Sequence, residues 1–301
     1  MTNIKQIILF LAFSSLLLQG CEAIFNSKDD STTDEIFDEG RQDPQQGEDV
    51  VGYAALVPFW DGFEEPTDIF VGFDELVYVT DSEGLTVLDE AGRRFQTIPF
   101  DGAVAVTQDR LFNVYVAARI DTVIDIVDPD ITWNLPVVYK INNANGAGPL
   151  NIVDTLVHPF MDDSRGTQAA QLSRLDKDSD INEELVEITG LTTLADNTLY
   201  VTRRGPSNNA TGFAAPDNTV LEFRQVVVDG EPTDQMRNVR QIRSINPNTP
   251  SLLSGIGMSA ITSFIGPPQR QSMSQDRSFM IAQADQSTEI PFRVLQVSVS
   301  E

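Results

Sequence analysis

A pattern of short apolar runs that recurs along the chain constrains its fold more than any other feature of the sequence. In residues 66–98, four runs rich in β-branched and aromatic residues are separated by short segments containing Asp, Glu or Gly. Runs of this length and composition predict four antiparallel strands joined by tight turns. One such sheet cannot bury both of its faces, so the pattern is expected to recur.

The second and third strands of this unit return three times in the same order. The Tyr-Val-Thr-Asp of the second strand, at residues 78–81, has counterparts at 115–118, 200–203 and 280–283. The Thr-Val-Leu-Asp of the third strand, at residues 86–89, has counterparts at 137–140, 219–222 and 293–296. An apolar first strand precedes each of these pairs, at 103–106, 188–194 and 258–264. Tandem four-stranded units predict an all-β fold, namely a β-propeller of antiparallel blades.

The number of blades follows less directly from the repeat. Residues 50–301 form the propeller domain, and dividing their length by roughly 42 residues per blade predicts about six blades, four of which are readable. The second and third intervals between Tyr-type anchors are about twice the first, so each contains a degenerate blade or long loops. Residues 151–160 are either the fourth strand of the second unit or part of a hidden blade. The last unit has no fourth strand, and residues 50–59 are expected to supply it and close the ring.

Residues 66–92 resemble the NHL repeat of six-bladed propellers. They contain a Pro, an apolar strand, a hairpin, a Val-Tyr-Val strand with Asp close behind it, and an apolar strand followed by Asp-x-x-Gly. The match is close in this unit alone. It implies a fold and hardly any function, because propellers serve as enzymes, binding modules and scaffolds.

Residues 1–20 predict export rather than a folded element. One Lys precedes an apolar run at residues 8–18, and small residues precede Cys21, as in a secretory signal peptide. The run is too short for a comfortable membrane span. Leu-Gln-Gly-Cys at residues 18–21 resembles the lipobox of bacterial lipoproteins, which implies an acylated Cys21 (for example with palmitate) as a membrane anchor. The alternative is an ordinary signal peptide with an incidental Cys.

Residues 21–49 predict a disordered acidic tether behind that anchor. Residues 22–49 contain ten acidic residues and only two basic ones, Lys28 and Arg41. A segment of this composition can bury too little apolar surface to order the chain. Glu22 after the Cys, in place of the Asp linked with inner-membrane retention, implies the outer membrane. The early Ser-Lys-Asp-Asp resembles a cue for export to the cell surface. Cys21 is the only cysteine, so no intramolecular disulfide can form.

The overall charge narrows the classes of partner. The formal net charge is −25, which repels nucleic acid and anionic lipid headgroups. We therefore expect no nucleic-acid partner, and a membrane association that depends on the lipid anchor.

One acidic segment has the ligand spacing of an EF-hand loop. The candidate Ca²⁺ ligands are Asp176, Asp178, Asp180, Asn182 and Glu187. Hard oxygen ligands at this spacing suit Ca²⁺. Ile181 replaces the Gly required at the sharp turn, and the following residues indicate a strand rather than a helix. The alternative interpretation is a solvated acidic loop between blades.

The repeat also places several polar residues at one position. The loop after the second strand of each blade opens on a common face of a propeller, and this position holds Asp81, Arg119, Arg203 and Arg204. The arginines could form a small cationic pocket for a carboxylate, a sugar acid or a phosphate. The alternative is that they pair with neighbouring acidic residues.

The remaining candidates give little support to catalysis. His158 is the only histidine and lies in an apolar run, which favours a structural role, and no phosphate loop or activated nucleophile is present. Trp60 and Phe63 could stack on a sugar but more often pack within a blade. The sequon at Asn209 has little meaning in a bacterial lipoprotein.

The sequence therefore predicts a non-enzymatic, lipid-anchored outer-membrane propeller that binds a protein or a small anionic or sugar ligand. The alternative is a Ca²⁺-dependent lactonase or hydrolase of the kind found on six-bladed propellers. Such an enzyme needs carboxylate or amide side chains converging from several first strands, and these strands are largely apolar.

Overall fold

The computed structural model describes residues 59–207, 216–241, 257–266, 277–284 and 292–299. The chain divides into two units, Met1–Trp60 and Asp61–Glu301. Only residues 59 and 60 of the first unit are described. The predicted signal peptide, the tether and nearly all of the proposed closing strand therefore lie outside the described residues. The fold that follows is that of the second unit.

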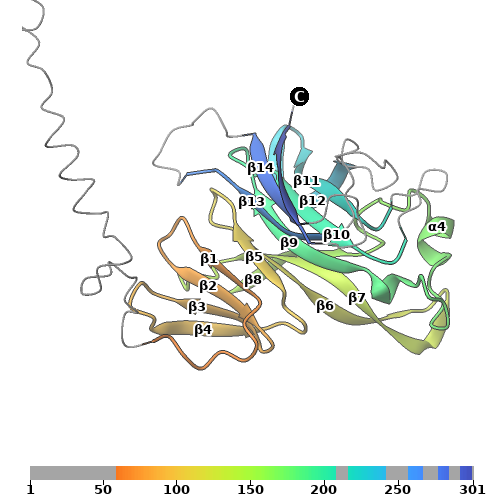
Figure 1. The fold of residues 1–301 in the computed structure, drawn as a ribbon, viewed down its shortest axis with the longest axis horizontal. Coiled ribbons are helices and arrows are strands. Elements are labelled where there is room, and N and C mark those ends of the chain that lie inside the picture. The colour runs from red at the N-terminus through yellow and green to blue at the C-terminus, as the bar shows by residue number, and fades with distance from the viewer. Residues whose placement is uncertain (1–58, 208–215, 242–256, 267–276, 285–291, 300–301) are drawn as a thin grey trace, which may run out of the picture. The chain divides into compact units, whose positions relative to one another are not determined.

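Four antiparallel sheets make up the second unit, each from consecutive strands (Figure 1). The first contains β1 (Asp68–Val71), β2 (Val77–Asp81), β3 (Gly84–Leu88) and β4 (Arg94–Pro99). The second contains β5 (Ala105–Gln108), β6 (Val114–Ile124), β7 (Asp128–Asn142) and β8 (Asn151–Val157). The third contains β9 (Glu187–Thr193), β10 (Leu199–Arg204), β11 (Thr219–Val228) and β12 (Glu231–Gln241). The fourth has three described strands, β13 (Met258–Ser263), β14 (Ser278–Gln283) and β15 (Arg293–Ser298).

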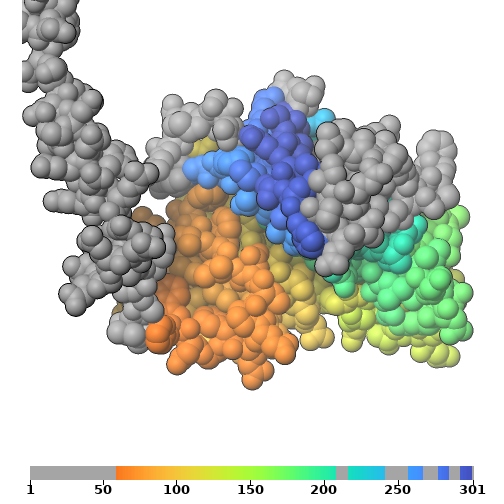
Figure 2. All heavy atoms as spheres, in the orientation of Figure 1, coloured from red at the N-terminus to blue at the C-terminus, as the bar shows by residue number. Residues whose placement is uncertain are grey.

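These sheets pack face to face in chain order, as the blades of a β-propeller do (Figure 1). In the space-filling view of Figure 2, the atoms of the first sheet (orange) adjoin those of the second (yellow). Their first strands are neighbours, because β5 lies against β1 and β9, and β9 lies against β13. Three clusters of buried apolar side chains fill the three interfaces between successive sheets. The predicted all-β propeller fold is confirmed.

Strand alternation explains how an inner sheet serves two interfaces. Along β6, Val114 and Val116 pack toward the first sheet, whereas Tyr115 and Ala117 pack toward the third. Both faces are buried, so the strand is a nearly continuous apolar run rather than an alternating one. Gly190 serves a similar close approach, because a Cβ there would lie 3.0 Å from the backbone N of Ile261 on β13.

The repeat signatures mark the strands that they were expected to mark. Tyr78, Tyr115 and Tyr200 lie on the second strands of their sheets and are buried. The hydroxyl groups of the first two donate to turn carboxylates, Tyr78 to Asp74 at 2.7 Å and Tyr115 to Asp109 at 3.0 Å. These bonds satisfy buried phenols and tie each second strand to the turn before it.

The described residues contain four sheets, which correspond to the four blades readable in the sequence; the total of about six blades stays a prediction. The additional length lies within and between these sheets. The β6–β7 hairpin extends far beyond its neighbours, β8 completes the second sheet, and residues 158–186 form an irregular excursion with α4 (Gln168–Leu172) and the 3₁₀ helix η1 (Glu183–Leu185). Dividing the length by a typical blade counts this excursion as a blade. Among the described residues, no helix is long and apolar enough to span a membrane.

Candidate functional site

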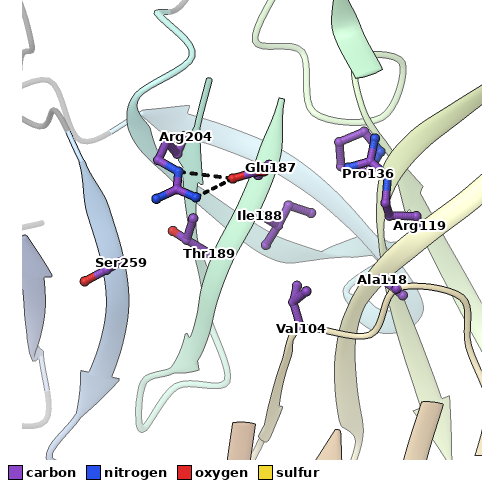
Figure 3. Close-up of a pocket in the computed structure, with 10 residues that line it drawn as sticks. Val104, Ala118, Arg119, Pro136, Glu187, Ile188, Thr189, Arg204 and Ser259 are labelled. Atoms are coloured by element: carbon purple, nitrogen blue, oxygen red, sulfur yellow. Dashed lines mark hydrogen bonds and ion pairs between the residues drawn. The ribbon is translucent and has the colours of Figure 1, made fainter. Parts of the chain in front are cut away.

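A pocket of about 400 Å³ contains part of the residue set predicted from the repeat. It is built by three sheets: the start of β9 and the end of β10, β6 with β7 and the segment before β5, and the start of β13 (Figure 3). Its lining residues are Gly102, Val104, Ala118, Arg119, Pro136, Glu187, Ile188, Thr189, Arg204 and Ser259. Two of the four residues predicted to bind a ligand, Arg119 and Arg204, therefore line one cavity.

Arg204 pairs with a carboxylate inside this pocket. Its Nε and Nη2 atoms lie 3.1 Å and 2.5 Å from Oε2 of Glu187. The two side chains are 48% and 50% exposed, respectively. This contact is the pairing with a neighbouring acid that the sequence left open as the alternative to ligand binding.

Arg119 is held mainly by carbonyl oxygens rather than by an acid. Its Nη2 donates to the carbonyl oxygens of Asn134 at 2.6 Å and Glu184 at 2.7 Å, and its Nε donates to the Asn134 side chain. Gly102 makes room for it, since a Cβ on this residue (φ 57°) would lie 3.2 Å from Cγ of Arg119. Burial lowers the pKa of the Arg119 guanidinium from its ordinary value, and the nearby charge of Glu184 opposes that shift.

Arg203 points away from this pocket, although it precedes Arg204 directly. Successive side chains of a strand generally face opposite sides of the sheet, and Arg203 and Arg204 do so here. Arg203 is 1% exposed and donates through Nη1 to Asp162 and to Ser164, each at 2.8 Å. The expectation that all three arginines form one pocket is wrong for Arg203.

Asp81 does not line the pocket. Its Oδ1 accepts from the backbone N–H groups of Glu83 at 2.9 Å and Gly84 at 3.1 Å, which closes the β2–β3 turn. Its Oδ2 is buried and has no hydrogen-bond partner among the described residues. The structure therefore gives Asp81 a turn-forming position.

A buried cluster of ionisable side chains accounts for Arg203. Its members are His158, Asp162, Arg165, Arg174, Glu183, Arg203 and Asp217. Three carboxylates balance three guanidinium groups, as burial of ions requires. The cluster fastens the excursion 158–186 to β10 and to Asp217, whose Oδ2 also accepts from the backbone N–H of Ser207 at 2.8 Å.

Glu183 is the centre of this cluster and is fully buried. Its carboxylate accepts hydrogen bonds from Nε and Nη2 of Arg165 at 2.9 Å and 2.8 Å. Nε2 of His158 lies 2.8 Å from the same carboxylate. Burial alone would raise its pKa, but the hydrogen bonds and charges of His158 and Arg165 outweigh burial and lower the pKa to about 2. Asp217 behaves alike, because Arg174 and Arg165 overcome its burial and lower its pKa to about 2.

His158 and Ser164 are not arranged as a nucleophile and its base. The His158 Nδ1 lies 2.5 Å from Asp162 Oδ2, and the Ser164 hydroxyl donates to Asp162 Oδ1 at 2.5 Å. The serine thus contacts the carboxylate rather than the imidazole, whose Nε2 faces Glu183. A Ser–His pair needs a hydrogen bond between the hydroxyl and the imidazole, and that bond is not made here. The contacts of His158 and Asp162 instead tie the excursion to β10 through Arg203.

The residues of the predicted Ca²⁺ loop do not converge. The side chain of Asn182 accepts from the backbone N–H of Glu184, that of Asp176 accepts from the N–H of Asp178, and Glu187 lies at the pocket. Asp178 and Asp180 are exposed. Within the described ranges, no group of three or more His, Cys, Asp or Glu side chains is placed to hold a metal ion. Calcium binding remains a prediction.

Phe63 takes the packing role that was the alternative to sugar stacking. It lies against the buried residues Val77, Val79 and Leu88, and the guanidinium of Arg94 sits 4.9 Å from its ring centroid. Asn209 lies outside the described residues.

Comparisons with known proteins add no family name. No family model matches the chain, and no curated protein matches it. The four described sheets support the propeller arrangement that the NHL resemblance implies, and the resemblance itself is confined to residues 66–92.

The sequence reasoning missed the buried cluster and the role of Glu187. A signal for the cluster was present in residues 158–186, where charges of both signs alternate in a stretch without strand periodicity. Interspersed charges of opposite sign in an irregular segment can indicate internal ion pairs, but their partners on β10 and at Asp217 are distant in sequence.

Proposed function

We propose that the chain is a lipid-anchored propeller of the bacterial outer membrane that binds a small anionic ligand in the Arg119–Arg204 pocket. The observation that carries this proposal is the pocket itself, in which two cationic side chains from different sheets line one cavity of about 400 Å³. Cavities of this size at the convergence of several elements are typical of ligand sites.

Charge supports an anion over a cation as the ligand. The chain carries a net charge of −25, yet the ionisable groups that line this pocket are two arginines and one glutamate. An anion is therefore favoured here by local charge, on a surface that elsewhere repels it. The anchor is supported by Cys21 and the residues before it, and the outer-membrane location by Glu22 directly after it.

The hydrolase alternative needs a bound metal, and no observation on the described residues favours it over binding. A binding module needs only the pocket.

Titration of the purified full-length chain with a panel of small carboxylates, sugar acids and phosphates, followed by calorimetry, tests the proposal. We expect Arg204→Gln to weaken binding of any ligand in this pocket by about ten-fold or more, since hydrogen bonds to charged groups contribute about 1.5–3 kcal/mol. Arg237→Gln on β12 removes the same charge outside the pocket and is the matched control. Equal affinities of the two variants would contradict the proposal.

A further inference from the structure

We propose that Glu187 is a resident carboxylate of the pocket, which holds Arg204 until a ligand carboxylate replaces it, and that the pocket takes small monocarboxylates with an apolar body. This inference rests on the proposed function and narrows it to one ligand class. Glu187 begins β9 and Arg204 ends β10, and the two residues are paired in the sheet. Figure 3 shows their side chains meeting at one side of the cavity.

The geometry of this pair leaves room for exchange. Both contacts from Arg204 go to a single oxygen, Oε2 of Glu187. Arginine binds a carboxylate best through two parallel hydrogen bonds to its two oxygens. Among the described residues, neither Nη1 of Arg204 nor Oε1 of Glu187 has a hydrogen-bond partner. A second carboxylate can therefore reach Arg204 before Glu187 leaves, so that the guanidinium is never unpaired.

The two adjacent arginines differ in how firmly they are held. Arg203 is buried against Asp162, where loss of a partner would leave an unpaired buried charge. Arg204 and Glu187 are each about half exposed, and ion pairs of this kind contribute little stability because water solvates the separated ions well. Of the two guanidinium groups, Arg204 is therefore the one that a ligand can take over at low cost.

The charge of the lining selects a monoanion. Arg119 and Arg204 contribute two positive charges and Glu187 one negative charge, so the ionisable lining has a net charge of +1. A dianion such as a phosphate monoester would meet the Glu187 carboxylate and the field of a chain with net charge −25. One carboxylate matches the charge and the planar shape of the guanidinium.

The uncharged lining residues favour a ligand whose remaining part is apolar. Four lining side chains are apolar or largely so, namely Val104, Ala118, Pro136 and Ile188. The hydroxyl groups of Thr189 and Ser259 lie on the side of β9 and β13 (Figure 3). Apolar walls with a few convergent polar groups suit a small organic ligand better than a bare ion.

Benzoate is the probe for this inference, with benzamide as its neutral analogue and phenyl phosphate as its dianionic one. The full-length chain is titrated and the ¹⁵N resonances of the arginine side chains are followed. We expect benzoate to bind the unmodified chain and to bind Glu187→Gln about two- to ten-fold more tightly, because the competing carboxylate and its repulsion are gone. Glu231→Gln, the same change at an exposed site outside the pocket, is expected to leave the affinity unchanged.

The outcomes separate this inference from the function on which it rests. Benzoate binding that Glu187→Gln does not strengthen beyond Glu231→Gln, or phenyl phosphate binding tighter than benzoate, overturns the resident-carboxylate inference and leaves an anion site. An equal gain for benzamide also overturns it, because the effect is then one of shape. If neither anion shifts the Arg204 resonance in either protein, the anion-binding function itself fails.

Discussion

Replacing Glu183 by Gln tests the buried cluster most directly, because the substitution keeps the side-chain volume while removing the charge. In the folded protein this carboxylate accepts two hydrogen bonds from Arg165 and faces the Nε2 of His158. The Gln amide offers one acceptor oxygen and turns an NH₂ donor toward groups that themselves donate. Three guanidinium groups then face two carboxylates, Asp162 and Asp217, in a largely buried site.

The magnitude follows from this burial. Removing one partner of a buried ion pair costs about 3–5 kcal/mol, because the charge that remains is uncompensated. For a domain of this size, 1 kcal/mol corresponds to a Tm change of about 2–4 °C, so a fall of about 6–20 °C is expected. Calorimetry and urea denaturation of the unmodified chain and the variant measure both quantities.

Glu187→Gln supplies the matched control, four residues farther along the chain. It removes the same charge from a pair that is half exposed, and exposed pairs contribute about 0.2–1 kcal/mol. A Glu183→Gln variant whose free energy of unfolding lies within 1 kcal/mol of that control would refute the reasoning, since the cluster would then be no more stabilising than a surface pair.

Three further predictions concern pH, calcium and the anchor. The pKa values of Glu183 and Asp217 are about 2 in the folded chain and near 4 in the unfolded chain. Each carboxylate therefore contributes about 2–3 kcal/mol to the free energy of unfolding above about pH 5, and this contribution is lost as the pH falls from about 5 to 2. Urea denaturation across that range measures the loss, which should be smaller in Glu183→Gln. The calcium proposal for residues 176–187 predicts that Ca²⁺ raises the Tm and that EDTA reverses the rise, and a Tm indifferent to both removes it. Cys21→Ala is expected to release the protein from the membrane fraction on cell fractionation, and continued sedimentation with membranes would contradict acylation as the anchor.

The strands were predictable from the sequence because they depend on local information. Short β-branched runs, tight turns and a recurring Tyr define β2, β6 and β10 wherever the pattern is kept. Length alone does not give the four sheets of the described ranges, because residues 158–186 add chain there without adding a sheet. The period of two could have shown that Arg203 and Arg204 face opposite sides of β10. No local pattern, however, indicates that Arg203 contacts Asp162, because the two residues are 41 positions apart in the sequence and meet only when the chain folds.

The excursion at residues 158–186 links the buried cluster to the pocket. An irregular segment has no strand ladder to satisfy its polar groups, so its position depends on specific partners. Here Glu183 fixes the start of η1 through the cluster, and the carbonyl oxygen of the next residue, Glu184, accepts from Arg119 at 2.7 Å. The Glu184 side chain also accepts from the backbone N–H of Asn134 at 2.6 Å, which ties η1 to β7 beside the cavity. The same ion pairs that stabilise the excursion therefore orient one of the two cationic side chains of the pocket. A variant that loosens the cluster without unfolding the chain, such as Glu183→Gln below its Tm, should weaken anion binding through Arg119, whereas Glu187→Gln should strengthen it through Arg204.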